Sequence, residues 1–508
     1  MLQRRKNTLS QVKYGAILSY GLIVLNMLYG LVITPFTIRC VGAEEYGVYK
    51  TIAALASSLM VIDLGIGGTI QRYVAKYRAD QQEEDIPNFM AMSMMITAAM
   101  NVAVLVVCCG VYVCIEPMYG ANFTADQIRL AQGLFVVLSI NMLALITENA
   151  LNGLITGYNR FVFGNGVKLL ALVLRVMLLC LLLPRVSSAL VIVWINVFIS
   201  ILTIAIQFLY IKNEIKVRIK FSHWDKKVFW ESGKYTVMMF LTSIVAQVFA
   251  NVDNILIGSF CGPGFVTVYS IGLLFFGMFQ NLSSGIAGVM LPTVTCVLSR
   301  DDGDEKICQV IIQAGKIQFI LLGAALIGFA CIGKDFVEVW LGEGYEDVYP
   351  ITLILLIPSI FELCINVCLS VLRAKNRLGF RTAITFLSAI LNVILTIVML
   401  KMWNYIGAAV ATACSYILCS LIAMNIYYIK VIKLPMLKIY RGILKRTVPC
   451  LVVAGACLYA TSRVIYGSWL AVGANVAVFC LVYGGMLLWI GLEKEEKKQI
   501  PLVGGFFK

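Results

Sequence analysis

The stretch Gly42–Tyr49 reads GAEEYGVY, and 220 residues later Gly262–Tyr269 reads GPGFVTVY. Without a gap, GIGG at 65–68 then lies over GIAG at 285–288. Apolar sequence of low complexity gives chance identities, so single matches carry little weight. Glycine, tyrosine and glutamate that recur in the same order carry much more. The sequence therefore predicts an internal duplication.

The match continues through the rest of both halves. Glu148 and Asn152 align with Glu362 and Asn366 at an offset of 214, and the segment from Arg160 aligns with that from Arg377 at an offset of 217. Tyr-Ile-Lys at 210–212 aligns with the same tripeptide at 428–430. Internal repeats in a membrane chain are typical of transporters, because a site between two repeats can open alternately to either side.

The composition predicts an all-α polytopic membrane protein. Hydrophobic residues make up 60% of the chain and charged residues 13%, against roughly 45–50% and about 25% in soluble domains. Apolar runs long enough to cross a ~30 Å hydrocarbon layer recur from end to end. We identify fourteen, at 14–38, 47–70, 89–114, 129–157, 162–183, 188–211, 235–260, 266–291, 312–333, 350–372, 382–402, 406–429, 447–466 and 468–491.

The offsets also predict the domain organisation. Residues 1–225 form an N-terminal six-helix lobe, 226–435 a second six-helix lobe, and 436–508 two extra transmembrane helices with a cytoplasmic tail. Because six is even, the second copy enters the bilayer in the same orientation as the first. We therefore expect parallel repeats, related by an axis along the membrane normal.

The net charge of +14 is distributed as in a membrane protein and not as in a nucleic-acid-binding one. With alternating spans that start inside, cytoplasmic segments hold 32 of the 41 Lys and Arg, and two, Lys168 and Arg175, lie within a span. The seven on external segments are Arg39, Lys50, Arg129, Arg185, Lys334, Lys401 and Arg463. This bias predicts that both termini are cytoplasmic, and it places the basic loops 212–234 and 430–446 against anionic lipid.

Enzymatic chemistry is disfavoured by the loops and motifs. The external loops 115–128 and 334–349 are too short for a catalytic domain. Gly328–Lys334 has the spacing of a phosphate-binding loop, but Asp335 stands where such a loop needs Ser or Thr. His223 is the only histidine, and the sixteen cysteines show no metal-ligand spacing. We expect no enzyme activity, no cofactor and no metal, and we interpret Asp302-Gly303-Asp304 as a solvated turn.

Charges inside spans are expensive and usually face a cavity or a partner. Lys168 and Arg175 are seven residues apart on the fifth span and share one helix face. Such a basic stripe suits a phosphate or pyrophosphate, for which Arg offers a fork and Lys a point charge. The alternative for Lys168 is an ion pair with Glu148, at about the same depth on the fourth span. The equivalent positions in the second lobe, Thr385 and Asn392, carry no charge.

Glu148 and three further acidic residues are candidates for sugar contacts or for coupling to a proton or sodium ion. Glu362, the repeat mate of Glu148, has no cation at its partner position, and an unpaired carboxyl in a medium of low dielectric constant binds a proton readily. Asp63 and Asp253 are similar. The alternative for each is a hydrogen-bonded structural acid.

Amide side chains lie beside Asp253. Gln247, Asn251 and Asn254 follow the i, i+4, i+7 spacing of one helix face. Amides supply uncharged donors and acceptors, which suit sugar hydroxyls. Hydrogen bonding between helices is the alternative.

Three motifs resemble those of the bacterial oligosaccharide and polysaccharide flippases, a family in the superfamily of multidrug and toxin extruders and lipid II flippases. They are VGAEEYGVY at 41–49, IDLGIG at 62–67 leading to QRY at 71–73, and VWLGEGY at 339–345. The resemblance covers essentially the whole chain. It implies a V-shaped exporter of the bacterial cytoplasmic membrane that moves polyprenyl-pyrophosphate-linked oligosaccharide from the inner to the outer leaflet, with a polysaccharide polymerase as a further partner.

The resemblance also implies roles for particular segments. In lipid II flippases, cavity arginines meet the pyrophosphate, a role that Arg175 and Lys168 fit by type, and a groove beside the last two helices takes the lipid tail, which 447–466 and 468–491 fit by order. A lipid II flippase stays an alternative, as does a multidrug extruder of organic cations. The basic stripe argues against the extruder, because cationic drugs need an acidic, aromatic-rich cavity.

Overall fold

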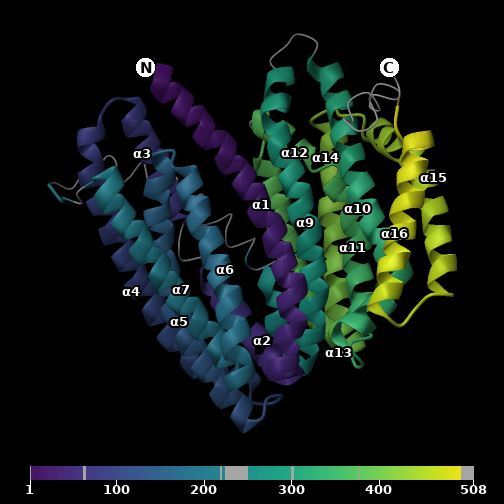
Figure 1. The fold of residues 1–508 in the computed structure, drawn as a ribbon, viewed down its shortest axis with the longest axis horizontal. Helices are drawn as coiled ribbons and strands as arrows, with labels where there is room; N and C mark the ends of the chain where they lie inside the picture. The colour runs from purple at the N-terminus through teal and green to yellow at the C-terminus, as the bar shows by residue number, and fades with distance from the viewer. Residues whose placement is uncertain are drawn as a thin grey trace. The chain divides into compact units, whose positions relative to one another are not determined.

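The computed structural model describes residues 2–60, 65–217, 220–222, 247, 250–298, 303–375 and 377–493. All regular secondary structure in these residues is helical, which confirms the predicted all-α class. The chain divides into two compact units, Met1–Thr267 and Val268–Lys508. Within each unit the long helices lie alongside one another (Figure 1). The three-part division at 225 and 435 stays a prediction.

Unit 1 is organised around one helix, α5. Its helices in chain order are α1 (Leu2–Val41), α2 (Ala43–Leu59), α3 (Ile66–Ala79), η2 (Glu83–Asp85), α4 (Ile86–Tyr119), α5 (Ala125–Gly157), α6 (Phe161–Val186), α7 (Ala189–Tyr210) and η3 (Ile211–Ile215). Residues 250–260 are also helical. α5 packs against α2, α3, α4 and α7, while α6 packs against α1 and α7. Tyr119, Leu134 and Phe135 are among the fully buried side chains of this core.

α3 and α5 approach closely at two glycines. A Cβ atom at Gly67 would lie 2.6 Å from the carbonyl oxygen of Asn149, and one at Gly153 would overlap the carbonyl oxygen of Gly67. Small residues let helix backbones meet in a membrane, where association depends on packing. α3 also starts after Gly65, whose φ of 65° is in the left-handed region that favours glycine. Packing and backbone conformation therefore account for glycines of the GIGG stretch.

The two acidic residues in the first turn of α2 are tied to the starts of two other helices. The Glu44 carboxylate accepts a hydrogen bond from the side chain of Gln127 at 2.7 Å. The Glu45 carboxylate accepts from the hydroxyl of Ser188 at 2.9 Å and from the backbone N–H of Ala189 at 2.6 Å. The GAEEYGVY stretch therefore joins α2, α5 and α7 at one end of unit 1.

Unit 2 contains most of α9 and all the helices that follow it. These are α9 (Pro263–Leu298), α10 (Gly303–Leu341), α11 (Val348–Cys364), α12 (Val367–Ala374), α13 (Gly379–Ser415), η4 (Tyr416–Ala423), α14 (Met424–Lys430), α15 (Met436–Ser462), α16 (Trp469–Met486) and η5 (Leu487–Gly491). α10 packs against α11 and α15, α15 against α16, and α11 against α13.

Two long segments of unit 2 change direction. α11 and α12 are joined through Ile365 and Asn366 with a bend of 45°. Within α13, Trp403 and Asn404 have non-helical backbone angles, and the φ of Asn404 is 54°. The repeat mate of α11–α12 in unit 1, α5, runs unbroken over its 33 residues. The sequence duplication is therefore not matched by identical helix geometry.

The chain is a multi-span membrane protein. In its described part ten helices are long and apolar enough to cross a membrane, or eleven if the bent α11–α12 pair is one span. The predicted fourteen includes 47–70, which α2 and α3 cover with 17 and 14 residues, and 235–260, which falls partly outside the described residues. The span test also counts the 52 residues Gly379–Lys430 once, across the break in α13. The count of fourteen stays a prediction.

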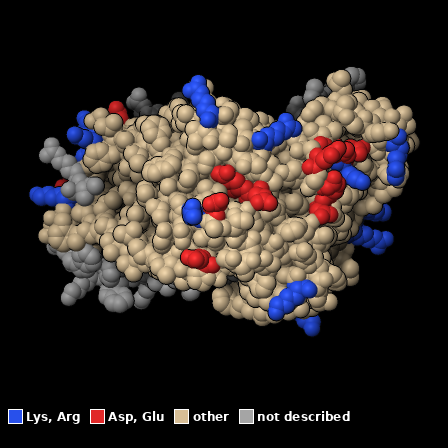
Figure 2. All heavy atoms as spheres, turned by 90° about the horizontal axis from the view of Figure 1, so that it is seen from below, with Lys and Arg blue, Asp and Glu red and all other residues tan. Residues whose placement is uncertain are grey.

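The surface of the helices is apolar. Large side chains such as Leu470 (87% exposed) and Leu481 (77% exposed) point outward. In a space-filling view, most of the visible surface is neither acidic nor basic (Figure 2). Helices that face lipid have this surface, because their backbone polar groups are satisfied internally and their side chains contact hydrocarbon.

Candidate functional site

A pocket of about 440 Å³ opens in unit 1 between α1, α5, α6 and α7. Glu148 of α5 and Lys168 and Arg175 of α6 all line it. The structure thus brings together the two predicted pyrophosphate-binding residues and the acidic residue predicted at the same depth. The remaining polar lining comes from Ser19, Asn26, Asn165, Ser200 and Thr203.

The two cations of the pocket are not neutralised by direct ion pairs. Lys168 is exposed to the pocket and Arg175 is half-buried. Among the described residues, neither has an acidic oxygen within 4.0 Å, so the alternative of a Glu148–Lys168 ion pair is not observed. The Nε of Arg175 is buried and has no hydrogen-bond partner there. These cations are therefore available to an anion.

The neutral polar residues of the pocket are held in place. The side-chain amide of Asn165 donates to the hydroxyl of Ser19 at 2.8 Å, which links α6 to α1. The hydroxyl of Ser200 on α7 donates to the side-chain oxygen of Asn141 on α5 at 3.1 Å. The walls around the cations are thus cross-linked by hydrogen bonds between two pairs of helices, α6 with α1 and α7 with α5.

A third cation of unit 1, Lys50 of α2, does not line the pocket and lies beside two aromatic rings. Its ammonium group lies 5.3 Å from the ring centroid of Tyr46 and 5.9 Å from that of Tyr49, within the range of cation–π attraction. The predicted topology places Lys50 on an external segment, although Tyr46 and Tyr49, four and one residues before it, were a signal for a shielded cation.

The other candidates predicted in the first half of the chain lie elsewhere. Asp63 lies outside the described residues. The amide of Asn251 donates to the side-chain oxygen of Gln247 at 2.8 Å, so these two share a face as predicted. Asp253 and Asn254 are buried. The pocket of unit 1 is lined by none of the four described residues, Gln247, Asn251, Asp253 and Asn254.

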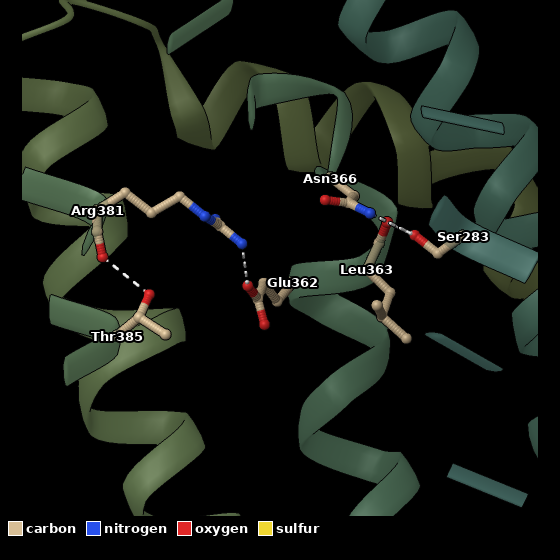
Figure 3. Close-up of polar contacts among 6 residues, drawn as sticks. All are labelled: Ser283, Glu362, Leu363, Asn366, Arg381 and Thr385. Atoms are coloured by element: carbon tan, nitrogen blue, oxygen red, sulfur yellow. Dashed lines mark hydrogen bonds and ion pairs between the residues drawn. The ribbon is translucent and has the colours of Figure 1, made fainter. Parts of the chain in front are cut away.

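Glu362 is paired, which corrects the prediction that it lacks a cation. Its Oε1 lies 3.4 Å from a guanidinium nitrogen of Arg381, and the side chains are 14% and 25% exposed. Arg381 reaches from α13 to the end of α11 (Figure 3). A proton-carrying role for an unpaired Glu362 is therefore not supported.

The partner of Glu362 lies one helical turn from the position that the repeat alignment indicates. The repeat alignment places Thr385 opposite Lys168, and Thr385 is neutral. Arg381 lies one turn earlier on the same face, and the Thr385 hydroxyl donates to its carbonyl oxygen at 2.8 Å. The residue of unit 1 at the Arg381 position is Gly164. A search one turn to either side of Thr385 would have found the partner.

Comparisons with known proteins agree on one family. The sequence model of the family described as polysaccharide biosynthesis protein matches residues 12–297. An uncharacterized membrane protein of Bacillus subtilis, EpsK, is 20% identical over 94% of this chain and 95% of its own length. The probable flippase AglR of Haloferax volcanii is 20% identical, with 82% of this chain and 83% of the relative covered. A putative O-antigen transporter of Shigella flexneri is 20% identical, with 77% of this chain and 92% of the relative covered.

Solved structures show the same fold. The lipid II flippase MurJ in an inward closed conformation aligns with a TM-score of 0.64 at 16% identity, covering 94% of this chain and 98% of MurJ. An inward-facing multidrug resistance transporter of the MATE family, in the MOP superfamily, aligns with a TM-score of 0.62 at 14% identity. The alignment covers 81% of this chain and 96% of that transporter.

Proposed function

The chain belongs to the polysaccharide biosynthesis protein family, and from this membership we propose that it moves a polyprenyl-pyrophosphate-linked oligosaccharide from the inner to the outer leaflet of a bacterial cytoplasmic membrane. It is a membrane transporter of polysaccharide biosynthesis and not an enzyme. Relatives whose names describe flippases and an O-antigen transporter support the proposal. The observation that carries it is the cationic pocket of unit 1.

The pocket binds the pyrophosphate in this proposal. Arg175 offers a planar fork of donors that fits two phosphate oxygens, and Lys168 adds a mobile point charge. Glu148 sits in the same pocket and lowers its net charge to about that of one cation. An incoming pyrophosphate satisfies the buried Nε of Arg175, which otherwise lacks a partner. The polyprenyl chain stays in lipid throughout.

Transport then follows alternating access. We propose fourteen spans with both termini cytoplasmic, arranged as parallel six-helix lobes at 1–225 and 226–435 in a V-shaped exporter, with two further helices beside the lipid tail. Changes in the packing of the lobes expose the head group first to one side and then to the other. No covalent bond is made or broken.

An extruder of organic cations is the competing function. A positively charged drug would meet Lys168 and Arg175 with no ion-paired acidic partner among the described residues. Like charges in a site of low dielectric constant repel strongly. A lipid II flippase requires a similar anion site, and only the choice of substrate separates it from the proposal.

The proposal is tested by flipping assays with purified protein in proteoliposomes. The substrate is a fluorescent short-chain polyprenyl pyrophosphate that carries one N-acetylglucosamine, and the readout is its accessibility to an external quencher. We expect Arg175→Ala to slow flipping by roughly 10-fold or more, since a hydrogen bond to a charged group contributes about 1.5–3 kcal/mol.

The matched control is Arg185→Ala, in the last turn of the same helix and outside the pocket. It should leave the flipping rate unchanged. Equal rates for Arg175→Ala and the wild type would refute the anion site. Transport of an organic cation such as ethidium, retained in Arg175→Ala, would support the competing function.

A further inference from the structure

A second polar pocket lies in unit 2, at the break between α11 and α12. It has a volume of about 250 Å³. Its polar lining comes from α9, α11, α12, α13 and η4, and comprises Gln280, Ser284, Glu362, Asn366, Ser370, Arg373, Arg381 and Tyr416. Broken helices in transporters commonly form binding sites, because their ends expose polar groups at membrane depth.

The break is braced by hydrogen bonds on the side away from the ion pair. The hydroxyl of Ser283 on α9 donates to the carbonyl oxygen of Leu363 at 2.9 Å, and the amide of Asn366 donates to that hydroxyl at 3.2 Å. Gln318 of α10 donates to the Ser283 carbonyl at 3.1 Å. Figure 3 shows Ser283 and Asn366 meeting at Leu363, while Glu362 points toward Arg381. The pocket is therefore part of a fixed scaffold.

The charges of this pocket disfavour a cation. The Glu362–Arg381 pair is neutral as a unit. Arg373 is exposed and makes no ion pair within the described residues, so it adds a positive charge. A sodium ion or proton would have to compete with Arg381 for the same carboxylate. The net charge instead suits a neutral or anionic ligand.

The free hydrogen-bonding capacity of the pocket suits hydroxyl groups. The Oε2 atom of Glu362 is buried and has no hydrogen-bond partner among the described residues, although the carboxylate also meets the Tyr416 side chain. Ser284 offers a hydroxyl and Arg373 several donors, and Gln280 keeps the part of its amide that is not bonded to Tyr416. Tyr416 adds an aromatic ring to the wall. Adjacent donors and acceptors beside a ring complement the alternating hydroxyls of a sugar.

We propose that this pocket binds one sugar ring of the lipid-linked glycan and so selects which glycan is transported. The inference rests on the proposed function. The size of the pocket agrees with one ring, because it lies just below the about 300–1,000 Å³ typical of sites for larger ligands. Unit 1 then recognises the pyrophosphate that all such lipids share, and unit 2 recognises the sugar in which they differ.

The test separates the two contributions by binding measurements on the full-length protein in nanodiscs. The probes are a short-chain polyprenyl pyrophosphate and the same lipid bearing one glucose, galactose, N-acetylglucosamine or glucuronic acid. The ratio of the two Kd values gives the contribution of the sugar. In the wild type we expect at least one sugar to tighten binding about 10-fold.

Two variants of the pocket, Gln280→Ala and Arg373→Ala, should each reduce that ratio at least 3-fold and leave the Kd of the bare lipid unchanged. The control Arg377→Ala removes a nearby exposed arginine that does not line the pocket, and it should keep the ratio. Arg175→Ala should weaken all probes equally and also keep the ratio.

The outcomes distinguish the two proposals. A ratio near one for every sugar in the wild type, or a ratio unchanged by both pocket variants, overturns the sugar site. If Arg175→Ala leaves the Kd of the bare lipid unchanged, only the anion site of unit 1 is overturned. If sodium chloride, compared with potassium chloride, tightens binding and Glu362→Gln removes that effect without changing the sugar ratio, the pocket is a cation site and the inference fails.

Discussion

At the scale of single residues, Arg175 carries most of the functional argument. Its Nε is buried and has no hydrogen-bond partner among the described residues, in a helix that is long and apolar enough to span a membrane, and a charge inside a span is costly. A residue of this kind is retained only where a ligand or a partner compensates for it. In the proposed function the pyrophosphate does so.

The geometry of Arg175 predicts an asymmetry between conservative changes. Arg175→Lys keeps the charge and loses the planar fork, so we expect it to restore only part of the flipping that Arg175→Ala loses. Lys168→Arg keeps a cation on a long stem at an exposed position and should retain nearly wild-type flipping. The rates in the proteoliposome assay check this order. Equal activity of Arg175→Lys and the wild type would show that charge alone is sufficient.

Residue spacing predicted that Lys168 and Arg175 of unit 1 share one helix face, but it did not predict that Arg381 pairs with Glu362 in unit 2. One physical reason explains both outcomes. Lys168 and Arg175 face one pocket because seven residues make two helical turns, which the sequence states directly. The partner of Glu362 depends on which turn of α13 lies opposite α11, and no spacing within one helix reveals that. Lys50 was missed because a charge near the end of a span resembles a loop charge, and only the spacing of Tyr46 and Tyr49 indicated otherwise.

At the scale of helices, the contact between α3 and α5 determines whether unit 1 packs. Gly67 and Gly153 meet backbone to backbone, so neither site has room for a Cβ atom. We expect Gly153→Ala to force these helices apart and to lower the thermal denaturation midpoint of the purified protein by several degrees.

The matched substitution is Gly68→Ala, next to Gly67 on α3, where a Cβ atom would meet no atom within 4 Å. It should leave the midpoint unchanged or raise it slightly, because alanine favours the helix. A fall in the midpoint for Gly68→Ala as large as that for Gly153→Ala would mean that the close contact between α3 and α5 does not determine the effect.

Helix boundaries show what periodicity predicts and what it does not. The long apolar runs correspond to helices such as α4, α5 and α6 at nearly the predicted positions. The break between α11 and α12 was not predicted, because the run 350–372 is predominantly apolar, with Glu362 and Asn366 as its only charged or amide residues. Those two polar residues lie at or beside the break, and the Ser283 hydroxyl that binds the Leu363 carbonyl comes from another helix.

At the scale of the whole molecule, the two units differ in the chemistry of their pockets. The pocket of unit 1 holds cations without direct ion pairs, whereas that of unit 2 holds a paired glutamate and arginine at a broken helix. Two units whose pockets differ in chemistry suit a substrate with two different ends, a charged pyrophosphate and an uncharged glycan.

Because the proposed transport moves negative charge outward, the rate of flipping should depend on the membrane potential. An inside-negative potential favours it by about 2.3 kcal/mol per net charge per 100 mV. Potassium gradients with valinomycin set the potential in proteoliposomes. Flipping from the negative to the positive side should be faster than flipping at zero potential, and the reverse potential should slow it. A rate independent of both potentials would indicate that the charge crosses fully compensated.

The central claim is that the pocket of unit 1 holds the pyrophosphate, and photo-crosslinking tests it most directly. The probe is a short-chain polyprenyl pyrophosphate with a diazirine on the carbon next to the phosphates, and mass spectrometry maps its adducts on the full-length protein. The account predicts adducts on the pocket-lining segments of α1, α5, α6 and α7, displaced by excess unlabelled lipid pyrophosphate and lost in Arg175→Ala. Adducts confined to other segments, or unaffected by Arg175→Ala, would contradict it.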